Sequence, residues 1–199
     1  MLEVEKKFEL DDASQAKLLA GTSFVSEKTF TDTYFDTKDF SLTTKDIWLR
    51  DRGGRFELKV PLNDTWDKRV SDQYRELETD AEISEFLHLA DDTALKEALH
   101  ASRYMPFASI VTTRRKYRKD KFIIDIDVLD FGYQIAEIEL MVKQESDIPV
   151  AVAEIIAFAS AYGLRLGYVR GKVIEYIRRN NLEHLRALVA AGVAPKTAL

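Results

Sequence analysis

The sequence predicts an α+β protein built on an eight-stranded antiparallel β-barrel with flanking helices. Strand signals follow one another along most of the chain, whereas helix signals occur in the connections and at the C-terminal end, a distribution typical of this class. No repeat, low-complexity segment or Gly/Ser/Pro-rich linker divides the chain. We therefore expect a single domain over residues 1–192 and a flexible tail over residues 193–199, after Gly192.

The strand signals are of three kinds. Residues 2–8 alternate between apolar and charged side chains, which indicates a strand with one buried face. Residues 29–36 are rich in Thr, Tyr and Phe. Residues 45–60 predict a hairpin, because Gly53-Gly54 suits a two-residue turn. Further strand signals cover residues 72–78, 108–118, 121–129 and 134–142.

Helix signals are fewer. Residues 147–162 begin with Pro149 in the first turn, can be capped by Ser146 or Asp147, and end before Gly163. The remaining predicted helices are a short one over 12–20, one or two over 80–100, and one continuous helix over 172–191 that stops at Gly192.

Composition excludes several classes of site and partner. The chain has no Cys, which excludes disulfides, thiolate zinc sites and a Cys nucleophile. The net charge of −5 argues against a dedicated nucleic-acid binder. The N-terminus lacks a signal-peptide apolar run, and no stretch approaches a membrane span. We therefore expect a cytoplasmic protein, without nucleic-acid or membrane partners, whose 32% charged residues exceed the usual ~25%.

Acidic residues recur at alternate positions of three predicted strands: Glu3 with Glu5, Asp125 with Asp127, and Glu137 with Glu139. One such strand is ordinarily a strand with a solvated face. Asp is a poor strand former, however, and in a barrel all three alternate faces could point inwards. Carboxylates gathered in this way cannot all stay ionised without a cation. Hard divalent ions with oxygen ligands, Mg²⁺ or Mn²⁺, meet this requirement.

The predicted hairpin has a cationic face. With Gly53 and Gly54 in the turn, the expected cross-strand pairs are Arg52 with Arg55, Arg50 with Glu57, and Trp48 with Lys59. The pairing of Arg52 with Arg55 is unfavourable unless an anion lies nearby. Carboxylates from the end strands together with Lys and Arg from the middle strands would suit a metal-bound phosphate chain.

The segment Glu3-Val4-Glu5-Lys6-Lys7 matches the Glu-x-Glu-x-Lys signature of the CYTH, or triphosphate tunnel metalloenzyme, superfamily. The order of the later motifs also fits, and the resemblance covers nearly the whole chain. Within the superfamily the sequence is most similar to the animal-type thiamine triphosphatases. That closer resemblance is carried by residues 32–37 (DTYFDT), Trp48-Leu49-Arg50, Phe56-Glu57-Leu58-Lys59 and Asp130-Phe131-Gly132-Tyr133.

The resemblance implies an eight-stranded barrel with a central tunnel and a hydrolase that cleaves thiamine triphosphate to thiamine diphosphate and phosphate with Mg²⁺. Separately, we expect the protein to be a monomer. The metal ligands it implies are Glu3, Glu5, Asp125, Glu137 and Glu139. The residues it assigns to substrate binding are Lys7, Trp48, Arg50, Arg52, Lys59, Arg114, Glu137 and Lys172. If the strand register shifted by one residue, Arg115 would replace Arg114.

The resemblance also implies that Tyr34 and Lys59 form a pair near the leaving group. The resemblance implies that Lys59 lowers the pKa of the Tyr34 hydroxyl, so that Tyr34 acts as a general acid. Trp48 would stack on the cationic, aromatic thiamine moiety. Trp48 is thus the residue that separates a thiamine-specific enzyme from one that acts on plain tripolyphosphate.

Several alternatives remain open. The chain could be an inorganic tripolyphosphatase, an adenylate cyclase-like enzyme of the same architecture, or a catalytically inert polyphosphate-binding barrel. Asp32 and Asp36 are equally suited to bracing basic residues or binding metal, and the directions of Arg75 and Glu76 are undetermined. We interpret Trp66 as a packing residue, and the three His as surface or packing residues.

Overall fold

The computed structural model describes residues 2–62, 74–90 and 93–199. The chain divides into two compact units. Among the described residues, the first comprises 2–29 and 111–175, and the second 30–62, 74–90, 93–110 and 176–199.

Eight strands form one antiparallel sheet in the order β1-β8-β7-β6-β2-β3-β4-β5, which confirms the predicted fold class. The strands are β1 (Leu2–Phe8), β2 (Ser23–Asp36), β3 (Trp48–Arg52), β4 (Arg55–Pro61), β5 (Tyr74–Leu77), β6 (Met105–Lys119), β7 (Phe122–Leu129) and β8 (Gln134–Val142). The helices are α1 (Asp12–Leu19), α2 (Asp80–Leu87), α3 (Leu95–Ala101), α4 (Ile148–Ala161), α5 (Lys172–Asn180) and α6 (Leu182–Ala190). Strands β2 and β6 contribute residues to both units.

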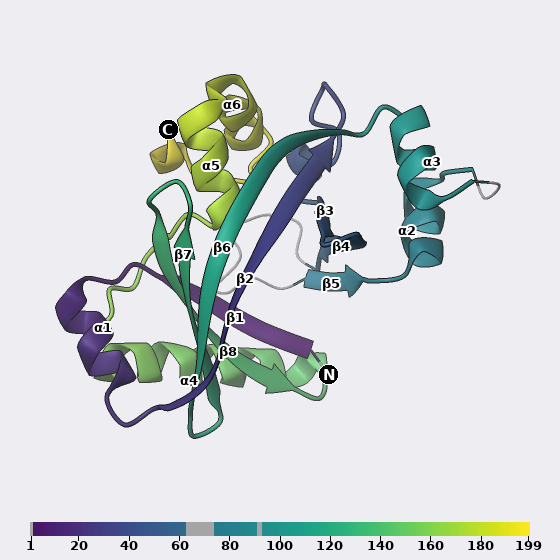
Figure 1. Ribbon diagram of the computed structural model, residues 1–199. Helices are drawn as coiled ribbons and strands as arrows, with labels where there is room; N and C mark the ends of the chain where they lie inside the picture. Colours follow the sequence, from purple (N-terminus) through teal and green to yellow (C-terminus); the bar gives the residue numbers. More distant parts are fainter. Residues whose placement is uncertain (1, 63–73, 91–92) are drawn as a thin grey trace. The chain divides into compact units, whose positions relative to one another are not determined.

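In the first unit, helix α4 covers the apolar face of β1, β7 and β8 (Figure 1). Val4, Ile124 and Ile138 are fully buried there against Ile155 of α4. Because successive side chains of a strand point to opposite faces, the charged residues between these apolar positions lie on the other side of the sheet. Burial under α4 therefore fixes the orientation of the acidic side chains.

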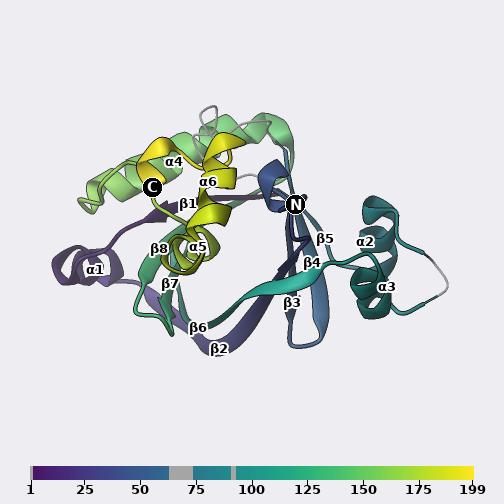
Figure 2. The ribbon, with the colours of Figure 1, turned by 90° about the horizontal axis from the view of Figure 1, so that it is seen from above.

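In the second unit, helices α2 and α3 lie side by side and pack against the apolar face of the β3–β5 strands (Figure 2). Leu49 and Leu58 face this core together with Ile83 of α2 and Leu99 of α3. The same alternation as in the first unit directs the charged residues of β3 and β4 to the opposite face.

The predicted continuous helix over residues 172–191 is wrong: α5 ends at Asn180 and α6 begins at Leu182. Asn181 separates them with an extended φ of −150°, and its side-chain oxygen accepts a hydrogen bond from the His184 backbone N–H at 3.0 Å. An Asn side chain that caps a new helix competes with continuation of the preceding one. Strands β2 and β6, which are neighbours in the sheet, also start earlier than predicted, at Ser23 and Met105 respectively.

The C-terminal residues and the helix lengths complete the description. Residues Lys196–Ala198 form a 3-10 turn in which Ala198 is buried. None of the helices within the described ranges combines the length and the apolar composition that a membrane crossing requires.

Candidate functional site

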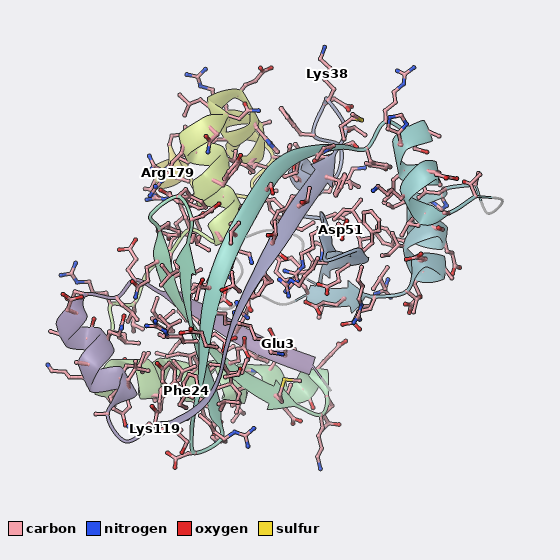
Figure 3. All side chains as sticks on the ribbon, in the orientation of Figure 1. Glu3, Phe24, Lys38, Asp51, Lys119 and Arg179 are labelled. Carbon is pink, nitrogen blue, oxygen red and sulfur yellow. The ribbon has the colours of Figure 1, made fainter. Side chains whose placement is uncertain are left out.

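The first unit gathers the predicted metal-binding carboxylates on the face of the sheet opposite α4. We call them, with the cations beside them, the acidic cluster: Glu3, Glu5, Lys7, Arg114, Lys116, Asp125, Asp127, Glu137 and Glu139 (Figure 3 labels Glu3). The strand register places Glu5 opposite Glu139, and Glu137 opposite both Lys7 and Asp125. Like charges thus lie directly opposite one another, an unfavourable arrangement without a cation.

The five predicted metal ligands form two groups of three that share one residue. Carboxylate oxygens of Glu3, Glu5 and Glu139 lie within 4.8 Å of one another, and so do those of Asp125, Glu137 and Glu139. Glu139 belongs to both groups. Oxygen donors in this number suit a hard divalent cation such as Mg²⁺.

The electrostatics of the acidic cluster also fit a cation. Burial, together with the charges of Glu3 and Asp125, raises the pKa of Glu139 to about 8. Burial likewise raises the pKa of Asp127, although Arg114 opposes the shift. Asp125 has no exposed surface. A divalent cation would relieve the repulsion that keeps Glu139 protonated.

Arg114 lies within the acidic cluster and contacts three of its carboxylates. Its guanidinium lies 2.7 Å from Asp125 and 2.6 Å from both Asp127 and Glu137. Burial alone would lower the pKa of Arg114, but the attraction of these carboxylates outweighs burial and raises it. Arg115 points to the other face, where it pairs with Glu27. The structure therefore places Arg114, not Arg115, among the acids.

Three lysines also belong to this part of the first unit. Lys7 Nζ lies 2.6 Å from Glu5 and 3.8 Å from Glu137. Lys116 Nζ lies 2.9 Å from Asp125 and 3.4 Å from Glu139. The sequence interpretation missed Lys116, although its position two residues after Arg114 on a basic strand was a usable signal. Lys172 begins α5, and its charge lowers the pKa of Asp127, partly offsetting burial.

The second unit carries a different cluster, which we call the aromatic–cationic cluster: Asp32, Tyr34, Asp46, Trp48, Arg50, Arg52, Glu57, Lys59, Tyr74 and Glu76. The predicted hairpin register is confirmed, with Trp48 opposite Lys59, Arg50 opposite Glu57, and Arg52 opposite Arg55. Gly53 and Gly54 form the turn with φ values of +64° and +88°. Positive φ at both central residues is the requirement of a type I′ turn.

Each cation of the hairpin is paired with an acid. Arg50 Nε donates to Glu57 at 2.7 Å, and Arg52 donates to both oxygens of the fully buried Asp32, at 2.6 and 2.9 Å. Burial would lower the pKa of Arg50, but attraction to Tyr34, Asp32 and Glu57 raises it instead. Arg52 and Arg55 tolerate each other because Arg52 pairs with Asp32 and Arg55 with Glu78.

Tyr34 and Lys59 lie on neighbouring parts of the same sheet. Tyr34 of β2 is opposite Arg50, and its ring lies 6.3 Å from that of Phe107. Lys59 of β4 is opposite Trp48, and its ammonium lies 2.7 Å from Glu76. The pairing of Tyr34 with Lys59 stays a prediction.

Asp32 and Asp36, whose roles the sequence left open, both contact protein groups. Asp32 braces Arg52, while Asp36 accepts hydrogen bonds from the backbone N–H groups of Leu42 and Thr43 at 3.0 and 2.8 Å. Trp66 lies outside the described residues. Sequence reasoning also missed Asp46, which accepts a hydrogen bond from Trp48 Nε1 at 2.7 Å.

Known proteins resemble this chain in sequence and in fold. Human thiamine-triphosphatase is 30% identical over 200 residues, an alignment that covers 90% of this chain and 85% of the relative. The structure of the PH1819 protein from Pyrococcus horikoshii superposes with a TM-score of 0.64 at 19% identity, covering 89% of this chain and 99% of that one. A Hippeastrum protein described as having a dominant triphosphatase activity superposes with a TM-score of 0.56 at 16% identity, covering 92% and 99%.

The likeness to the solved structures concerns the fold alone. The family itself follows from the sequence, because residues 1–167 match the CYTH domain. This match includes both the acidic cluster and the aromatic–cationic cluster described above. The chain therefore belongs to the CYTH domain family.

Proposed function

We propose that the protein is a Mg²⁺-dependent hydrolase that cleaves the terminal phosphate of thiamine triphosphate, giving thiamine diphosphate and phosphate. The observation that carries the hydrolase part is the acidic cluster, in which buried carboxylates on facing strands require a cation. Thiamine specificity is supported by the thiamine-triphosphatase relative and by Trp48. Membership of the family is consistent with a small triphosphate substrate.

In this proposal Glu3, Glu5, Asp125, Glu137 and Glu139 hold the metal. When bound, Mg²⁺ supplies positive charge that neutralises and orients phosphate oxygens. Mn²⁺, which prefers the same oxygen ligands, is expected to substitute for it.

The cations are assigned to the triphosphate, and two residues to the leaving group. The residues assigned to binding phosphate oxygens and stabilising their developing charge are Lys7, Arg50, Arg52, Lys59, Arg114 and Lys172. Tyr34 donates a proton to the leaving group, with its hydroxyl tuned by Lys59. Trp48 stacks on thiamine.

The experiment is a substrate panel read by phosphate release. Purified protein is incubated with thiamine triphosphate, inorganic tripolyphosphate or ATP, each with Mg²⁺, with Mn²⁺ or with EDTA. We expect the highest kcat/KM for thiamine triphosphate and no turnover with EDTA. A preference for tripolyphosphate, or conversion of ATP to cyclic AMP, would favour the corresponding alternative; binding without phosphate release would favour an inert polyphosphate-binding barrel.

Trp48→Ala sharpens the substrate assignment. Loss of stacking is expected to lower kcat/KM for thiamine triphosphate by about tenfold and to leave tripolyphosphate unchanged. Trp66→Ala is the matched control, because it removes the other of the two tryptophans. Equal losses for both substrates after Trp48→Ala would contradict the thiamine assignment.

A monomeric state, a cytoplasmic location and a single domain over residues 1–192 with a flexible tail over 193–199 are further proposals. Light scattering coupled to size-exclusion chromatography tests the first. Fluorescence localisation tests the second. A chain truncated after Gly192 that folds and turns over substrate normally would support the third.

A further inference from the structure

Asp46 is a buried acid for which the proposed chemistry has no use. It lies two residues before Trp48, at the end of the 3-10 turn Thr43–Lys45, and only 6% of its surface is exposed. Its backbone is left-handed, with φ +60°. Asp tolerates this conformation better than most residues other than glycine, and here it turns the chain from the 3-10 turn into β3.

The Asp46 side chain holds two aromatic rings of the aromatic–cationic cluster. Trp48 Nε1 donates to Asp46 Oδ1 at 2.7 Å, and the Tyr74 hydroxyl lies 3.1 Å from each carboxylate oxygen. The indole has two rotatable bonds, and this hydrogen bond, together with packing of its ring, restricts both. Asp46 therefore fixes the orientation of the Trp48 indole, 6% of which is exposed.

Asp46 also changes the charge around the indole. A carboxylate that accepts a hydrogen bond from the indole N–H makes the ring face more electron-rich, and burial strengthens this effect. Lys59 of the hairpin is opposite Trp48, lies 5.7 Å from the Tyr74 ring centroid and pairs with Glu76. An electron-rich indole attracts a cationic aromatic ring more strongly than a neutral one.

We propose that Asp46 is a specificity-determining positioning residue, which orients and polarises the Trp48 indole for a cationic aromatic leaving group. This inference rests on the proposed function. Thiamine carries such a group and inorganic tripolyphosphate does not, so Asp46 affects one substrate only. The stacking contact is remote from the phosphate that is cleaved and is the same before and during the reaction, so its loss raises KM and leaves kcat unchanged.

The test compares Asp46→Ala, Asp46→Asn and the control Asp39→Asn on thiamine triphosphate and tripolyphosphate. Asp46→Ala removes both the acceptor and the charge, and we expect KM for thiamine triphosphate to rise about tenfold. Asp46→Asn keeps an acceptor and loses the charge, so we expect a rise of about threefold. Tripolyphosphate kinetics stay within about twofold of wild type in both variants. Asp39, whose carboxylate accepts a hydrogen bond from the Thr37 hydroxyl at 2.7 Å, serves as an acid of the same unit outside the cluster.

A binding measurement independent of turnover completes the test. In a Trp66→Phe background, Trp48 is the remaining tryptophan, and thiamine diphosphate is titrated against its fluorescence. We expect Asp46→Ala to raise the Kd about tenfold. A wild-type preference for thiamine triphosphate that survives Asp46→Ala overturns this inference alone, as does an equal loss for both substrates. A wild-type enzyme without that preference overturns the proposed function, and this inference with it.

Discussion

The acidic cluster of the first unit and the aromatic–cationic cluster of the second follow the same strand alternation but balance their charges differently. In the second, each of the three cations pairs with an acid: Arg52 with Asp32, Arg50 with Glu57, and Lys59 with Glu76, while the fourth acid, Asp46, accepts from Trp48. In the first, carboxylates outnumber the cations among them, and Glu5 lies directly opposite Glu139.

This difference indicates two kinds of preparation for an anionic ligand. Ion pairs with carboxylates hold the arginines of the second unit in fixed positions, so that these side chains need little ordering when an anion binds. The acidic cluster instead keeps an excess of negative charge, which only an added cation can balance. The following predictions test this contrast.

The largest expected effect is on catalysis. Glu137→Gln removes one charge from the acidic cluster, and we expect kcat/KM for thiamine triphosphate to fall on the order of 100-fold or more. The Mg²⁺ concentration for half-maximal phosphate release should rise as well. Glu57→Gln in the second unit and the exposed Glu145→Gln are the matched variants, and neither should change the Mg²⁺ requirement. Wild-type activity in Glu137→Gln would show that the metal assignment is wrong.

The next effect is on stability. Arg114→Met leaves Asp125, Asp127 and Glu137 without their shared guanidinium, and we expect the free energy of unfolding to fall by about 3 kcal/mol. Arg52→Met should cost about 1–2 kcal/mol, because Arg50 remains 3.9 Å from Asp32. Urea unfolding at neutral pH measures both. Equal losses would contradict the contrast between the two clusters.

The pH dependence of stability provides a third comparison. Burial and neighbouring acids raise the pKa of Glu139 from 4.5 to about 8, so the folded chain binds more protons than the unfolded chain between these values. Without divalent ions, stability should therefore fall as pH rises from 4.5 to 8, by at most about 1.4 kcal/mol per pH unit. Thermal unfolding with and without Mg²⁺ tests this. Mg²⁺ should stabilise more at pH 8 than at pH 5, and Glu139→Gln should flatten the slope.

The second unit contains a titration of opposite sign and smaller effect. Burial lowers the pKa of His184 from 6.5 to about 4, although Asp36 opposes the shift. The unfolded chain then binds more protons between these values, so stability is lost as pH falls from 6.5 to 4, by at most about 1.4 kcal/mol per pH unit. His184 Nε2 lies 2.7 Å from Thr43 Oγ1, a contact that His184→Gln can keep. The stability of this variant should fall less between pH 6.5 and pH 4. If it falls as much as in the wild type, groups other than His184 cause the loss.

Much of the fold could be predicted because its signals are local. Gly53-Gly54 places the hairpin turn, and a turn of known length determines which residues of β3 and β4 are opposite. Alternation in β1, β7 and β8 assigns Glu5, Asp125 and Glu139 to one face, because their apolar neighbours must be buried. The helix break at Asn181 could not be predicted from helical periodicity, because it depends on a side-chain cap.

By itself, the sequence determined which side chains share a face, and therefore the acidic and cationic character of each strand. The tertiary structure decided which strands are neighbours, since β1 pairs with β8, a strand far from it in the sequence. Only this pairing places Glu5 opposite Glu139, and burial together with neighbouring acids raises the pKa of Glu139 to about 8. Likewise, the loop conformation at Asp46 brings its carboxylate to Trp48. Alternation is a property of consecutive residues, whereas proximity and burial depend on segments far apart in the chain.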